Sequence, residues 1–144
     1  MLQQVMNDIN QQLKSINITN YKINESKLQQ LYDELVIHSM QPEKYFSYFV
    51  SYGLLLLHLE MHNQLLDNCE KEECNNIILY GDLFYSLYYE YASKNTFSLI
   101  RHNIARVLES IEIQNLHHLN SSNYLLSEWI NIMKQEDLDD ELFS

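Results

Sequence analysis

Glycine and proline are almost absent from this chain of 144 residues, which holds two glycines, Gly53 and Gly81, and one proline, Pro42. Tight turns between strands depend on these residue types, so a sheet protein with many short turns is disfavoured. Hydrophobic residues make up 46% of the chain and aromatic residues 12%, enough to build a buried core. At this length the sequence predicts a single all-α domain over residues 1–144.

Hydrophobic residues recur at helical spacing in six segments of the chain. The predicted helices cover residues 2–17, 25–39, 43–68, 76–93, 95–115 and 121–135. We therefore expect a bundle of about six helices, which begins with an N-terminal helix over 1–17. The last residues, 136–144, form an acidic tail that we expect to be frayed.

The chain is strongly acidic, with a net charge of −11 and only two arginines, Arg101 and Arg106. This balance disfavours nucleic acid and any phosphate-rich ligand held by this chain alone. The N-terminus lacks a basic start followed by an apolar stretch, so we expect no signal peptide and a cytoplasmic location. Reduced thiols at Cys69 and Cys74 follow from that expectation. The most apolar run, 45–61, is too short for a spanning helix, so we expect no membrane span.

The third and fourth predicted helices are apolar or aromatic on nearly every face, whereas an outer helix of a small bundle needs one apolar stripe. Apolar surface left over after packing would form an interface with a partner, rich in tyrosine as interface cores are. The alternative is a central helix that the other five cover.

Two histidines and two cysteines suggest a metal site. His58 and His62 lie four residues apart, on one face of a helix, and Cys69 and Cys74 follow. Four such residues can bind zinc, but structural sites use more closely spaced cysteine pairs. The alternative is two helix-face histidines and two loop thiols.

The sequence offers no clear catalytic nucleophile. Acidic neighbours make the thiols of Cys69 and Cys74 poor nucleophiles. Catalytic serine motifs and phosphate-binding glycine motifs are lacking, so we predict no catalytic residue.

The segment MHNQLLD (61–67) resembles the first aspartate-rich motif of the all-helical trans-prenyl diphosphate synthases, Leu/Ile-His-Asp-Asp-x-x-Asp. His62 takes the histidine position, Asn63 and Gln64 replace the two leading aspartates, and Asp67 keeps the last. Neutral amides do not offset the charge of Mg²⁺ and diphosphate as carboxylates do. The motif is therefore degenerate, and we expect no metal on it.

Further segments extend the resemblance. LYGD (79–82) is similar to a Leu-x-Gly-Asp signature of these synthases, although the loop before it lacks their diphosphate-binding arginine pair. GDLFYSLYY (81–89) and SLIRHNIARVLESIE (98–112) resemble the small component of bacterial two-component heptaprenyl and hexaprenyl diphosphate synthases. The core of the resemblance is 43–115, and the fold that it implies is a truncated trans-prenyl synthase fold.

This resemblance implies a non-catalytic small subunit of a heteromeric prenyltransferase, inactive alone and without a cofactor of its own. A catalytic large subunit would carry the Mg²⁺ and the farnesyl and isopentenyl diphosphate substrates. The complex would make heptaprenyl or hexaprenyl diphosphate for menaquinone side chains, and this chain would support the partner and the control of product length. The residues expected at the partner interface or tunnel wall are Phe49, Tyr52, Leu56, Leu83, Phe84, Leu87, Tyr88 and Tyr91. A stand-alone helical adaptor and a zinc-stabilised helical domain are the alternatives.

Overall fold

The computed structural model describes residues 1–19, 21–65, 69–96, 104–116 and 122–143, and all of their side chains except those of 115–116, 122 and 136–143. Within these ranges the chain forms six α-helices, one short 3-10 helix and no strand, which confirms the predicted all-α class. The elements are α1 (Leu2–Lys14), α2 (Glu25–Ile37), η1 (Pro42–Tyr45), α3 (Phe46–Leu65), α4 (Lys71–Asn95), α6 (Ile104–Leu116) and α7 (Ser122–Phe143).

The observed boundaries differ from the predicted ones at several places. The helix predicted from residue 43 is preceded by η1, where Pro42 occupies a first-turn position that needs no backbone N–H. α4 begins at Lys71, within the acidic connector, and its first turn carries Glu72 and Glu73, which favour a helix N-terminus. α7 continues to Phe143, so the tail that we expected to be frayed is helical. The predicted helical residues 66–68 and 97–103 lie outside the described residues.

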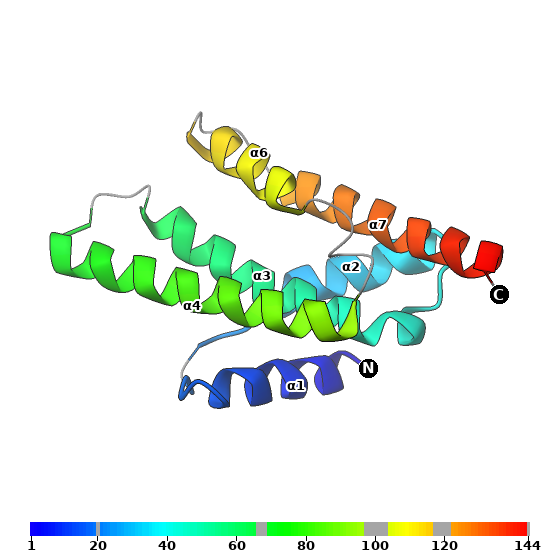
Figure 1. The fold of residues 1–144 in the computed structure, drawn as a ribbon, viewed down its shortest axis with the longest axis horizontal. Helices are drawn as coiled ribbons and strands as arrows, with labels where there is room; N and C mark the ends of the chain where they lie inside the picture. Colours follow the sequence, from blue (N-terminus) through cyan, green and yellow to red (C-terminus); the bar gives the residue numbers. More distant parts are fainter. Residues whose placement is uncertain (20, 66–68, 97–103, 117–121, 144) are drawn as a thin grey trace.

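α3 is the central helix of the fold. Figure 1 shows α3 and α4 side by side, with α1 along one side of this pair and α6 and α7 along the other. Every residue from Tyr48 to Leu59 is buried, so α3 contacts protein on all its faces. The continuous apolar run of this helix is thus explained by neighbours within the same chain. This arrangement matches the alternative in which other helices cover a central one.

α4 has one buried face and one exposed face. The buried face presents Phe84, Leu87 and Tyr88 to the core. Leu79 and Tyr89 lie on the opposite face and are 56% and 53% exposed. α4 is therefore amphipathic in its packing, although its sequence is apolar or aromatic nearly all round.

Trp129 anchors α7 to the central pair of helices. Its side chain is fully buried, and its ring centroid lies 5.2 Å from that of Tyr52 on α3 and 6.4 Å from that of Tyr88 on α4. Aromatic pairs at these distances add to the energy of simple burial. A single side chain thus joins three helices.

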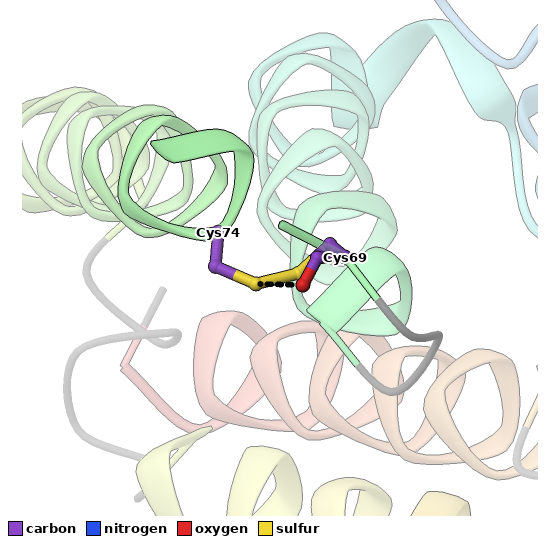
Figure 2. The surroundings of a disulfide bond; sticks show 2 residues. All are labelled: Cys69 and Cys74. Atoms are coloured by element: carbon purple, nitrogen blue, oxygen red, sulfur yellow. Dashed lines mark hydrogen bonds between the residues drawn. A yellow bond between two sulfur atoms is a disulfide. The ribbon is translucent and has the colours of Figure 1, made fainter. Parts of the chain in front are cut away.

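Cys69 and Cys74 form a disulfide, which corrects the expectation of reduced thiols. Cys69 precedes α4 and Cys74 lies in its first turn, so their Cα atoms come within 5.7 Å, a distance that a disulfide spans. Figure 2 shows the bridge, with a dashed line for the 3.5 Å approach of Cys74 Sγ to the Cys69 carbonyl oxygen.

Among the helices of the described residues, none is long and apolar enough to cross a membrane.

Candidate functional site

A cluster of two histidines and a glutamate lies where α3 meets α4 and α6. His58 and His62 project from one face of α3, as their four-residue spacing predicts, and their ring centroids are 4.2 Å apart. Glu112 of α6 reaches the same place, with its Oε1 3.0 Å from His62 Nδ1. Each of the three residues offers one metal-ligand atom, and these atoms all lie within 4.8 Å of one another.

His58 is held in one orientation by the backbone of α4. Its Nδ1 lies 2.8 Å from the carbonyl oxygen of Gly81. A carbonyl only accepts, so Nδ1 carries the hydrogen, and Nε2 of the neutral ring keeps its lone pair. Burial lowers the pKa of His58 and outweighs the opposing effects of the Gly81 hydrogen bond and of the Glu112 and Asp82 carboxylates, while the neighbouring His62 lowers the pKa further. His58 is therefore neutral near pH 7 and able to act as an acceptor or a metal ligand.

Gly81 allows the close approach of α3 and α4 at this site. A Cβ atom at Gly81 would lie 3.3 Å from Cδ2 of His62 and 3.4 Å from Cβ of Met61, which is tighter than ordinary packing contacts. The absence of a side chain thus brings the backbone carbonyl within reach of His58. This is the kind of close approach for which glycine is suited.

A pocket of about 430 Å³ opens beside the cluster. Asp82 of α4 and Glu109 and Glu112 of α6 line it, together with both histidines. Among the described residues that line the pocket, none is lysine or arginine. The three carboxylates in this lining favour a cation over a phosphate group.

The structure brings together only part of the candidate zinc set that the sequence raised. His58 and His62 are neighbours, as expected, but Cys69 and Cys74 are bonded to each other, so neither offers a thiolate to a metal. Sequence reasoning missed Glu112, because its contact with α3 depends on tertiary packing that no local pattern encodes. The only available signal was a charged residue within an apolar helix.

Asp82 is the aspartate of the LYGD segment. The structure adds it to the acidic lining of the pocket. Its place beside the histidines follows from Gly81, the preceding residue, which faces His62.

Seven of the residues expected at a partner interface or tunnel wall are buried within this chain. They are Phe49, Tyr52, Leu56, Phe84, Leu87, Tyr88 and Tyr91. Leu83 is partly buried. In this structure the seven buried side chains contribute to the core, so a partner would contact other residues, and the interface remains a prediction.

Of the segments behind the family resemblance, MHNQLLD begins in the last turns of α3 and LYGD lies within α4. Asn63 and Gln64 are exposed on the last turn of α3, and Asp67 lies outside the described residues. Met61 and His62 of the first segment pack against Gly81 of the LYGD segment. No family model, no curated protein and no solved structure matches this chain.

Proposed function

We propose that this chain is the non-catalytic small subunit of a two-component trans-polyprenyl diphosphate synthase and supports a catalytic large subunit. The observation that carries the proposal is the contact between the two segments of the resemblance: Gly81 in LYGD packs on Met61 and His62 in MHNQLLD. These segments are separate in the sequence. Their contact in the structure is consistent with the derivation of both segments from a single ancestral site. The all-helical fold is also consistent with the proposal.

The residues present favour a supporting role over catalysis by this chain. Asn63 and Gln64, which stand in place of two metal-binding aspartates, carry neutral amides on the exposed end of α3. The pocket beside His58 and His62 is acidic, whereas a diphosphate requires arginine, lysine or bound Mg²⁺. Mg²⁺ and both diphosphate substrates would accordingly bind to the large subunit, and the complex would make heptaprenyl or hexaprenyl diphosphate.

The surface proposed for the partner is the outer face of α4. Ile78, Leu79 and Tyr89 are 45%, 56% and 53% exposed there, and the partly buried Leu83 adjoins them on the helix. We call these four residues the outer α4 surface. The prediction that the fourth helix contacts the partner is kept. The contact is assigned to side chains that a partner can reach, in place of the buried side chains that were named from the sequence.

A mixing assay tests the proposal. Labelled isopentenyl diphosphate and farnesyl diphosphate are given to this chain alone, to the trans-prenyl synthase homologue of the same genome alone, and to both. The expected result is a stable complex and long-chain product only when both proteins are present. Product from this chain alone, or a homologue whose activity does not change on mixing, would contradict the proposal. A stable complex without product would point to the helical adaptor.

Two single substitutions test the outer α4 surface. Leu79→Asp places a charge within the proposed contact and should weaken association at least tenfold, because a desolvated unpaired charge costs several kcal/mol. Ile37→Asp is the matched control, since Ile37 is 70% exposed on α2. Association and product length should change with Leu79→Asp and not with Ile37→Asp. Equal behaviour of the two variants would mean that the outer α4 surface is not the interface.

A further inference from the structure

We infer that His58, His62 and Glu112 form a binding site for one divalent transition-metal ion of the zinc class. This goes beyond the proposed function, which assigns the catalytic Mg²⁺ to the partner, and it does not depend on that proposal. The three ligand atoms lie within 4.8 Å of one another. Ligands of one tetrahedral Zn²⁺ are about 2.1 Å from the ion and so about 3.4 Å from each other. Small side-chain rotations would close the difference.

The pair His62 Nδ1 and Glu112 Oε1 is close enough for both atoms to bind one ion after a small separation. These atoms are 3.0 Å apart, and the two side chains are 31% and 46% exposed, so an ion can enter from solvent. They come from different helices, α3 and α6. A metal held by both would therefore also join these helices.

His58 is preorganised as the third ligand. Its Nδ1–H donates to the Gly81 carbonyl at 2.8 Å, which leaves the Nε2 lone pair for a metal. Histidine ligands in proteins commonly use their second nitrogen in this way, because the hydrogen bond fixes the tautomer and the ring orientation.

The surroundings favour a cation of this class. Asp82 and Glu109 add negative charge to the lining of the pocket, and the described lining residues include no lysine or arginine. Two imidazoles with one carboxylate suit zinc, cobalt, nickel or ferrous iron, whereas Mg²⁺ and Ca²⁺ prefer oxygen ligands only. Three protein ligands beside an open pocket leave at least one position for water, as in sites where the metal acts on a bound molecule.

A simple ion pair between His62 and Glu112 is the competing explanation, and metal titration separates the two. The untagged full chain, with its disulfide intact and metal removed by chelation, is titrated with Zn²⁺ by calorimetry and with Co²⁺ by visible absorption, each in excess Mg²⁺. The expected result is one ion per chain and a Co²⁺ spectrum with nitrogen ligands. Absence of stoichiometric binding, or loss of binding in excess Mg²⁺, would overturn the inference.

Substitutions locate the site. His62→Gln and Glu112→Gln should each weaken Zn²⁺ binding at least tenfold. His38→Gln is the matched control, because His38, the C-cap residue of α2, forms a similar pair with Glu34 at 3.7 Å. Unchanged Zn²⁺ binding in both site variants would overturn the inference.

A readout without mutation completes the test. In the unmodified chain, Zn²⁺ should shift the histidine ring resonances of His58 and His62 and leave those of His38 in place. If the resonances of all three histidines shift alike, the ion is binding to surface imidazoles in general, and the assignment is wrong.

Discussion

Tyr88 shows how a single buried group limits the stability of this fold. Its ring is fully buried, yet its hydroxyl has no hydrogen-bond partner among the described residues. A buried polar group without a partner costs about 1–3 kcal/mol. Tyr88→Phe removes the hydroxyl and keeps the ring contact with Trp129, so we expect the free energy of unfolding to rise by about 1 kcal/mol, measured by urea denaturation.

Tyr91 supplies the control for this substitution. Its hydroxyl donates to Asp8 Oδ2 at 3.4 Å, so Tyr91→Phe removes a hydrogen bond between α4 and α1. We expect no gain in stability from Tyr91→Phe. A loss of stability in Tyr88→Phe as large as that in Tyr91→Phe would show that the Tyr88 hydroxyl is satisfied in solution.

The buried tyrosines also determine the response to alkali. Burial raises the pKa of Tyr52 and Tyr88 above the ordinary value of 10.0. In the unfolded chain these phenols ionise above pH 10, and in the folded chain they stay protonated. Their contribution to stability is therefore complete below pH 10 and is lost as the pH rises, by about 1.4 kcal/mol per pH unit for each tyrosine. Denaturation midpoints at pH 9 to 11 should fall less steeply in Tyr88→Phe, and equal slopes would contradict the assignment.

At the level of elements, Gly53 determines how closely α1 lies on α3. A Cβ atom at Gly53 would collide with Cδ1 of Ile9, which is fully buried on α1. Overpacking of this kind costs about 1–3 kcal/mol, and the better helix propensity of alanine returns about 1 kcal/mol. Gly53→Ala should therefore lower the free energy of unfolding by about 1 kcal/mol.

Ile9→Val tests the cause of that loss. Alone, it deletes one buried methyl group and should cost about 1 kcal/mol. Combined with Gly53→Ala, it removes the colliding atom, so the double variant should be more stable than the sum of the single effects, by thermal or urea denaturation. Strict additivity would show that α1 moves away from α3 as a whole.

The disulfide stabilises the beginning of α4, where the N-cap residue Glu70 makes no capping hydrogen bond with its side chain. Cys69 and Cys74 are separated by five positions, and closing so short a loop contributes about 2 kcal/mol. The Cys69→Ser, Cys74→Ser double variant should lose up to that amount. Faster amide exchange should appear in the first turn of α4 and not in α3. If the unmodified protein loses no stability on reduction, the bridge is not formed in solution.

The helices were predictable because their hydrophobic spacing is local. Val5, Ile9 and Leu13 have the predicted spacing on α1 and are all buried. The end of α7 was missed because a run of acidic residues looks like a solvated tail, whereas it contains good helix formers and no glycine or proline. The disulfide was missed because the expected redox state was derived from the N-terminus and not from the spacing of the two cysteines.

At the scale of the whole molecule, the sequence did not reveal which apolar surface is internal. The tyrosines and leucines of α3 and α4 were expected to face a partner, and most of those named are instead buried within this chain, where α3 packs chiefly against α4 and also against α1 and α2. Composition cannot separate these outcomes, because core and interface use the same residue types. The same limit applies to the candidate metal site, whose third ligand lies on a helix that begins some forty residues beyond His62 in the sequence.

Trp129, the only tryptophan, reports whether α7 belongs to the same cooperative unit as the central helices. It packs between Tyr52 of α3 and Tyr88 of α4, so its emission should be blue-shifted in the native state. We expect the fluorescence transition in urea to coincide with the loss of helical circular dichroism, as in a two-state protein. Trp129→Ala should cost about 3–5 kcal/mol, because it leaves a cavity among three helices. A fluorescence midpoint at lower urea than the dichroism midpoint would show that α7 detaches first, and that the α3–α4 pair is stable without it.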